Sequence, residues 1–197
     1  MTLPGLVVIT DWSLGEPRLF SQLEAALGAG PAVAVQHRNP GATARVYFEQ
    51  AVRLRALCAR FAAPLFVSAR LDVALALEAH LHLPAWGLRP ADVRDQLPSG
   101  RWLSVAVHNE AEAADAAGAH LALVSPVFPT SSKPGAALLG PAGFARLTAG
   151  LGCPAFALGG MTAQRAAQLP RGTGLAVSSA VLSAADPAAV VRALAAG

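Results

Sequence analysis

Two short motifs near the C-terminus, Gly159-Gly160 and Ser178-Ser179, have the composition of an anion-binding site. Glycine leaves the backbone open to a ligand and tolerates positive φ, and serine adds hydroxyl and backbone N–H donors. Donors at the start of a helix favour a phosphate through the helix dipole. The alternative interpretation is that the glycines form a tight turn that binds no ligand, and that Ser179 simply caps a helix. Their position in the fold decides between these interpretations.

Other residues with chemical potential are spread along the chain. Thr130, Ser132 and Lys133 lie in a long loop rich in Pro, Ser and Gly, which suits a second anionic group, a lid, or a solvated polar loop. Arg38 can bind a carboxylate or phosphate in bidentate fashion, or form a surface ion pair. Histidine titrates near neutral pH, so His108 can transfer a proton, or it can be a hydrogen-bonded core residue.

The elements that must position these residues alternate along the chain, because short apolar runs are followed by Ala- and Leu-rich stretches at helical spacing. The predicted strands are Leu6–Thr10, Ala32–His37, Pro64–Ser68, His80–Leu83, Trp102–His108, Leu121–Val127, Pro154–Leu158 and Leu175–Ser178. The predicted helices are Arg18–Leu27, Ala42–Phe61, Leu71–Ala79, Pro90–Leu97, Glu110–Ala117, Pro141–Ala149, Ala163–Leu169 and Pro187–Ala196. This alternation predicts a single (β/α)8 TIM barrel over residues 1–197.

The alternative to a closed barrel is an open doubly wound sheet. The count of eight strands favours the barrel, as does the lack of a GxGxxG motif after the first strand. Functional residues of a barrel stand at the carboxyl ends of its strands, and the loops after strands 7 and 8 often bind phosphate. We therefore expect Gly159-Gly160 and Ser178-Ser179 to form a phosphate site, with Arg38 and His108 on the same rim.

The remaining histidines are placed by strand alternation. His37 lies between Gln36 and Arg38, so it should face the helices while its two neighbours face the barrel. His80 and His82 share one face of their strand, and the one nearer the strand end can reach the rim. No carboxylate pair stands at the strand ends, so the residues alone predict no metal site.

Composition argues against several classes of protein. The net charge of +3 is scattered, no Lys/Arg run occurs and aromatic residues make up only 6%, so nucleic-acid binding is not expected. No stretch reaches the ~18 apolar residues of a membrane helix, and the N-terminus lacks a signal-peptide pattern. Cys58 and Cys153 have no metal-ligand spacing, which is typical of reduced thiols in a cytoplasmic protein.

Hydrophobic residues make up 54% of the chain and charged residues only 14%. This leaves an apolar surface, which has two explanations. Part of the surface is buried in a homo-oligomer, or alanine-rich surface helices raise the hydrophobic fraction.

Seven stretches, in order and at matching spacing, resemble the thiamin phosphate synthase/TenI superfamily along nearly the whole chain. They are Val7–Asp11, Val35–Arg38, Arg70–Leu75, Val107–Ala113, Pro126–Lys133, Ala157–Met161 and Ala176–Ala180. In the synthases of this superfamily, a thiazole phosphate displaces pyrophosphate from an aminopyrimidine pyrophosphate, and magnesium holds the leaving group. The resemblance implies a barrel whose ligand is a phosphorylated thiazole.

The resemblance also implies roles for individual residues. Gly160 and Ser179 would hold the thiazole phosphate. The residues that would contact the pyrophosphate or its equivalent are Gln36, Arg38, Thr130, Ser132 and Lys133.

This sequence departs from the synthase pattern at the metal ligands. Synthases have Asn-Asp after strand 3, where this chain has Ser68-Ala69, and a Gly-Gln-x-Asp type segment after strand 4, where it has Pro84–Gly87. Pro40 stands near the expected lysine, and Ala106 replaces a serine. Alanine and glycine side chains offer a hard divalent ion no oxygen ligand. We therefore expect no cofactor, with magnesium needed only if synthase activity is retained.

The Leu83-Pro84 segment is similar to the TenI branch, whose known activity is thiazole tautomerase. That reaction moves a proton to aromatise a thiazole carboxylate phosphate and needs an acid/base and an anion pocket, but no metal. The tautomerase pattern places its catalytic histidine where this chain has Pro126, as synthases do, so His108 or His82 would have to substitute.

The first functional hypothesis is thus a metal-independent thiazole tautomerase of thiamin biosynthesis. The alternatives are a thiamin phosphate synthase and a non-catalytic protein that binds or senses thiazole phosphate or thiamin phosphate.

Overall fold

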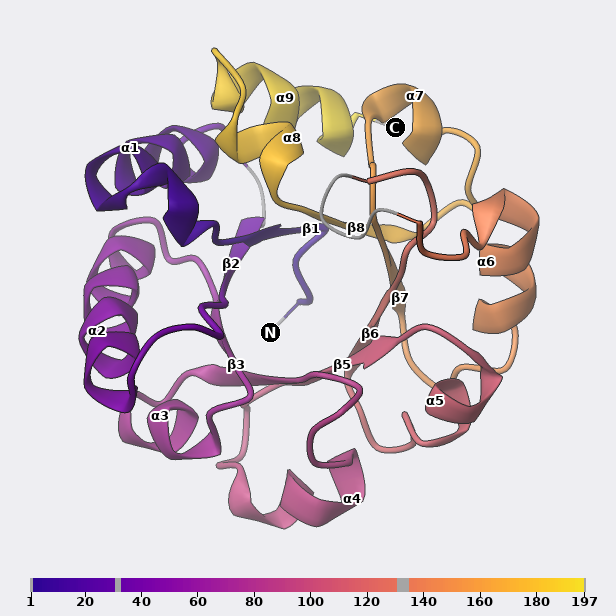
Figure 1. The fold of residues 1–197 in the computed structure, drawn as a ribbon, viewed down its shortest axis with the longest axis horizontal. Coiled ribbons are helices and arrows are strands. Elements are labelled where there is room, and N and C mark those ends of the chain that lie inside the picture. The colour runs from indigo at the N-terminus through magenta and orange to yellow at the C-terminus, as the bar shows by residue number, and fades with distance from the viewer. Residues whose placement is uncertain (1, 31–32, 131–134, 197) are drawn as a thin grey trace.

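Eight parallel strands close into a barrel (Figure 1). The computed structural model describes residues 2–30, 33–130 and 135–196. The strands are β1 (Leu6–Ile9), β2 (Val33–His37), β3 (Leu65–Ser68), β4 (His80–Leu83), β5 (Leu103–Val107), β6 (Leu121–Val124), β7 (Ala155–Leu158) and β8 (Gly174–Val177). Each strand pairs with the next, and β8 closes the ring by pairing with β1, Ala176 opposite Val7. The predicted TIM barrel is confirmed, and the open sheet is excluded.

Helices surround the barrel (Figure 1). They are α1 (Glu16–Leu27), α2 (Ala44–Arg60), α3 (Leu71–Ala76), α4 (Pro90–Val93), α5 (Glu110–Ala114), α6 (Gly140–Thr148), α7 (Ala163–Ala166), α8 (Ser179–Leu182) and α9 (Pro187–Ala195), with the 3-10 helices η1 (Trp12–Leu14) and η2 (Arg94–Gln96). In α2, Thr43 caps the first turn by accepting from Val46 N, and Tyr47, Ala51 and Leu54 share the buried face. This spacing is that of an amphipathic helix packed on a sheet.

Several element ends differ from the sequence prediction. Neither η1 nor α8 was predicted as a separate helix, and α3 ends at Ala76 because Glu78 has a positive φ of 49°. Strand β6 stops short of the predicted Val127, since Pro126 has no N–H for the ladder. Val127 N instead donates to Leu158 O at 2.9 Å, which draws the following loop toward β7.

Side chains fill the barrel interior. The inward-facing apolar residues are Val7, Ile9, Ala34, Phe66, Trp102, Leu121, Leu123, Phe156 and Ala176. The His80 ring stacks on Trp102 with centroids 4.5 Å apart, and burial lowers the pKa of His80 to about 4. The N-terminal segment runs across the middle of the ring, where Leu3 packs on this interior cluster (Figure 1). A filled interior leaves the rim as the place for a ligand.

No helix in the described part of the chain is long and apolar enough to cross a membrane. Apolar side chains are exposed on the outer helices, among them Phe48 and Val52 of α2 and Leu75 of α3. The homo-oligomer expected from the apolar surface stays a prediction.

Candidate functional site

Gly159 and Gly160 follow β7 at the carboxyl rim, as predicted. Both have positive φ, 100° and 61°. A Cβ on Gly159 would lie 3.0 Å from Pro126 Cα, and one on Gly160 would collide with the carbonyl oxygen of Pro129. The pair therefore needs glycine for both conformation and space. It packs the β6 loop against the β7 loop and leaves backbone, rather than side chains, at this part of the rim.

Ser178 and Ser179 follow the neighbouring strand β8. Ser178 precedes the short helix α8, and its carbonyl accepts from the N–H groups of Val181 and Leu182. Its side chain makes no capping hydrogen bond among the described residues. A short helix after strand 8 is the element with which many barrels bind phosphate. The two motifs form what we call the β7–β8 arc, defined by Gly159, Gly160, Ser178 and Ser179.

A cation that the sequence analysis missed contacts the β7–β8 arc. Arg165 of α7 donates from Nη1 to the carbonyl of Gly160. Its guanidinium also lies over the Phe128 ring, 5.2 Å from the centroid. Arg165 thus braces the glycine turn against the β6 loop. Only the tertiary contact with Phe128 identifies it, because nothing in its sequence neighbourhood does.

Arg38 is held at the end of β2 by hydrogen bonds to its backbone. Thr10 Oγ1 accepts from Arg38 N at 2.9 Å and donates to Arg38 O at 3.1 Å, and Trp12 Nε1 donates to the same hydroxyl. These bonds tie the ends of β1 and β2 together. Arg38 is exposed at the mouth, while Gln36, one inward position below, is buried.

His37 packs against the helices, as predicted. Its ring stacks on Tyr47 of α2 with centroids 4.0 Å apart, and its Nε2 lies 3.2 Å from Tyr47 O. Burial lowers the pKa of His37 to about 4. The Tyr47 hydroxyl also donates to His37 O and accepts from Ser68 N, which joins the ends of β2 and β3.

His82 lies inside the barrel below the mouth, with Nδ1 2.9 Å from Ser104 Oγ. Burial, together with the charges of Arg38 and His108, lowers the pKa of His82 to about 3. The ring is therefore neutral at physiological pH and is a weak base. Its electrostatic coupling to Arg38 and His108 indicates that these two residues lie near it at the mouth.

His108 stands just after β5, half-buried, and is held by a carboxylate. Glu112 Oε2 lies 2.7 Å from His108 Nδ1 and accepts from His108 N at 2.8 Å. The sequence analysis missed Glu112. The sequence did carry a signal for it, because an acidic residue three positions after a capping residue is the capping-box pattern. Asn109 caps α5 by accepting from Glu112 N.

The rim at β3 and β4 is different, and we call it the β3–β4 arc, defined by Ser68, Ala69, Pro84 and Ala85. The nearby Asp72 is paired with Arg70 at 2.5 Å, and this hydrogen bond lowers the pKa of the carboxyl group. In residues 2–30, 33–130 and 135–196, no three His, Cys, Asp or Glu side chains are grouped to hold a metal ion. Ser68 carries the only side-chain oxygen of the β3–β4 arc, and the expectation that the protein needs no metal stays a prediction.

Two predicted site residues, Ser132 and Lys133, lie outside the described residues. Thr130 is described and is partly buried at the start of the same loop, after β6. The predicted site residues that the structure describes therefore lie at the ends of β2, β5, β6, β7 and β8, all on one rim.

A filled eight-stranded barrel with backbone donors and serine hydroxyls at the ends of β7 and β8 has the features of a phosphate-binding TIM barrel. The family model described as thiamine monophosphate synthase matches residues 6–185. The chain belongs to this family, as the sequence resemblance predicted.

Comparisons with individual proteins agree with this family assignment. The chain is 36% identical to a thiamine-phosphate synthase of Chloroflexus aurantiacus, covering 96% of this chain and 90% of the relative. It is 37% identical to one of Xanthobacter autotrophicus, covering 96% and 92%. Among solved structures, the thiamine phosphate pyrophosphorylase of Pyrococcus furiosus is similar, with a TM-score of 0.82, 30% identity, and 97% and 93% of the two chains covered. A 3-hexulose-6-phosphate synthase, at 15% identity and a TM-score of 0.70, shares the fold.

Proposed function

We propose that the protein is a thiamin phosphate synthase, in which a thiazole phosphate displaces pyrophosphate from an aminopyrimidine pyrophosphate. The observation that carries the proposal is the β7–β8 arc in a chain that matches synthases over 96% of its length. The comparisons give no support to the tautomerase that the sequence analysis placed first, because the named relatives above are synthases. Pro126 also occupies the position at which the tautomerase pattern has its histidine.

The residues have separate tasks in this proposal. The backbone of Gly160 and the hydroxyl of Ser179 hold the thiazole phosphate. Arg38 faces the charge that develops on the departing pyrophosphate, and a fixed cation at that point stabilises the transition state more than the ground state. Gln36 and Thr130 contact the same group, and the family resemblance assigns Ser132 and Lys133 to it as well.

The test is formation of thiamin phosphate from the two substrates. Purified protein is incubated with aminopyrimidine pyrophosphate and thiazole phosphate, with magnesium or with EDTA, and the product is measured by mass spectrometry. We expect product well above the enzyme-free control, and Arg38→Ala should lower the rate. No product under either condition, from protein that calorimetry shows to bind thiazole phosphate, would make this a non-catalytic binding protein.

A second candidate is the thiazole tautomerase, and the β3–β4 arc is the observation that favours it. This arc has no carboxylate for a metal, whereas the His108–Glu112 pair supplies an acid/base at the mouth. Incubation with the non-aromatic thiazole carboxylate phosphate should then yield the aromatic tautomer. A rate equal to that in buffer would exclude this reaction.

A further inference from the structure

The carboxylate of Glu112 is shared among three donors that belong to two consecutive residues. Oε2 accepts from His108 N at 2.8 Å and lies 2.7 Å from His108 Nδ1, and Oε1 accepts from Asn109 Nδ2 at 3.0 Å. The side chain of Glu112 is 28% exposed, so these bonds are partly shielded from water. A charged acceptor with several donors fixes the geometry of the groups around it.

Capping of α5 does not by itself require this arrangement. Asn109 already caps the helix by accepting from Glu112 N at 3.0 Å. In the usual capping box, the acidic side chain accepts from the backbone of the cap residue. Here Oε2 instead reaches one residue further back, to both the backbone and the ring of His108. The main interaction of the carboxylate is therefore with the histidine.

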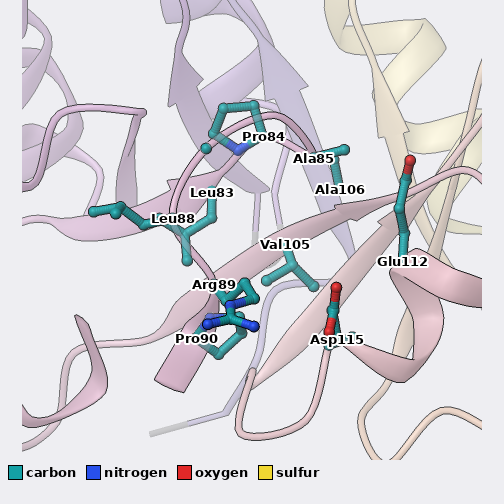
Figure 2. Close-up of a pocket in the computed structure, with 12 residues that line it drawn as sticks. Leu83, Pro84, Ala85, Leu88, Arg89, Pro90, Val105, Ala106, Glu112 and Asp115 are labelled. Carbon is teal, nitrogen blue, oxygen red and sulfur yellow. The ribbon is translucent and has the colours of Figure 1, made fainter. Parts of the chain in front are cut away.

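The two ring nitrogens of histidine point in divergent directions, so a partner on one of them sets where the other points. Glu112 approaches from the helix side, where it lines a small cavity of about 50 Å³ between α5 and the β4–α4 loop. Figure 2 shows Glu112 reaching from α5 beside Ala106 at the end of β5. Ser104, on the inward face of the same strand, bonds to His82 inside the barrel, and His108 continues that face.

We propose that Glu112 is a positioning residue that keeps a proton on Nδ1 of His108 and turns Nε2 toward the barrel mouth. Nε2 is then the nitrogen that meets the phosphorylated substrate, as an acceptor when the ring is neutral and as a donor to a phosphate oxygen when it is protonated. The catalytic part of this inference rests on the proposed function. The orientation of the ring does not, and can be measured without turnover.

The ring itself provides the first measurement. Long-range ¹H–¹⁵N spectra of histidine-labelled protein distinguish the two neutral tautomers, and the sequence has only five histidines to assign. In the native protein, neutral His108 should carry its proton on Nδ1. Glu112→Gln should move protons to Nε2, and Glu112→Asp should retain part of the Nδ1–H form. The matched control is Glu110→Gln, an exposed carboxylate on the same helix, which should leave the spectrum unchanged.

Kinetics provide the second measurement. Glu112→Gln should lower kcat by at least ~10-fold, in the range of a lost proton-transfer or charged hydrogen-bond partner, while KM for thiazole phosphate changes little. In a His108→Ala background, the same substitution should have no further effect on kcat, because Glu112 acts through the ring. Additive losses in this double-mutant cycle would show a merely structural role.

The outcomes separate the two proposals. An Nδ1–H tautomer that survives in Glu112→Gln overturns the positioning role, as does a changed tautomer with unchanged kcat. If the native protein makes no thiamin phosphate, the proposed function fails, yet the spectra still decide whether Glu112 sets the ring. If circular dichroism shows that Glu112→Gln does not fold, Glu112→Asp and the His108→Ala cycle with Glu112→Asp carry the same test.

Discussion

The β7–β8 arc and the β3–β4 arc lie on one rim but are built by different chemistry. In the first, Gly159 and Gly160 expose backbone beside serine hydroxyls, and a Cβ at either glycine would meet the β6 loop. In the second, Ala69 and Pro84 stand at the strand ends, followed by Trp86, which is 79% exposed. Phosphate recognition needs mainly backbone geometry, whereas metal chemistry needs specific side chains. This barrel has the backbone geometry for phosphate in the β7–β8 arc, while its β3–β4 arc has no carboxylate side chain.

The two sides also differ in their titrating groups. Strand β4 carries the buried histidines His80 and His82, with pKa values lowered by burial to about 4 and about 3. Strands β7 and β8 carry none. Burial of a neutral imidazole is tolerated only while it stays neutral. Together with His37 of β2, whose pKa burial also lowers to about 4, these residues make the β2–β4 side the acid-sensitive half of the barrel.

The largest predicted effect is a loss of stability at mildly acidic pH. The unfolded chain protonates these histidines near pH 6.5, whereas the folded protein does so only near pH 4 and 3. The part of the free energy of unfolding that depends on neutral histidine rings is therefore present above pH ~6.5 and is lost as the pH falls toward those values. Between pH 7 and 5, each histidine can lower the free energy of unfolding by up to ~2 kcal/mol. Urea titrations at the two pH values measure this loss.

The variant His82→Gln tests the assignment to β4. Glutamine does not titrate and can still bond to Ser104, so the stability of the variant should depend less on pH than that of the native protein. Hydrogen exchange at pH 5 should also show β4 amides opening before those of β8. Equal pH dependence in the two proteins would mean that another group carries the effect.

The next effect concerns the β7–β8 arc. Gly160→Ala should lower the free energy of unfolding by about 2–3 kcal/mol, because the new methyl meets the Pro129 carbonyl in a backbone conformation that strains alanine. Affinity for thiazole phosphate should fall at least ~10-fold, since the turn that carries the donors must shift. Urea titration and calorimetry measure the two effects.

Gly172→Ala is the matched control. Gly172 also has a positive φ, 81°, but a Cβ there has nothing within 4 Å. It should cost only ~1 kcal/mol of backbone strain and leave ligand affinity unchanged. Equal effects of the two substitutions would remove the distinction between a ligand-bearing turn and an ordinary one.

The sequence predicts those parts of the protein that depend on local patterns and misses those that depend on tertiary contacts. The barrel follows from local patterns, since each strand is a short apolar run and each helix has its own buried stripe. The β7–β8 arc follows as well, because glycine and serine act there through the backbone at the ends of two predicted strands. Arg165 and Glu112 were missed because their roles depend on contacts that only the folded chain makes, with Phe128 and with the His108 ring.

A smaller effect is expected at the hydroxyl of the β7–β8 arc. Ser179→Ala should weaken thiazole phosphate binding by about 5- to 10-fold, which corresponds to one hydrogen bond of ~1 kcal/mol. Stability should barely change, because Ser179 is exposed. Ser183→Ala, an exposed serine just after α8, is the control and should leave the affinity unaltered. Calorimetry that finds native affinity in Ser179→Ala would remove this hydroxyl from the site.

The smallest effect, and the one of opposite sign, belongs to the β3–β4 arc. Ala69 has a φ of 63° while its N–H donates to His82 O at 2.9 Å, so the alanine holds a left-handed conformation that glycine adopts without strain. Ala69→Gly should raise the free energy of unfolding by ~0.5–1 kcal/mol and leave ligand affinity unchanged. Ala62→Gly, at a φ of 51° after α2, should stabilise similarly, because both gains come from the backbone alone. A loss of affinity confined to Ala69→Gly would instead place ligand contacts at the end of β3, and the contrast between the two arcs would have to be withdrawn.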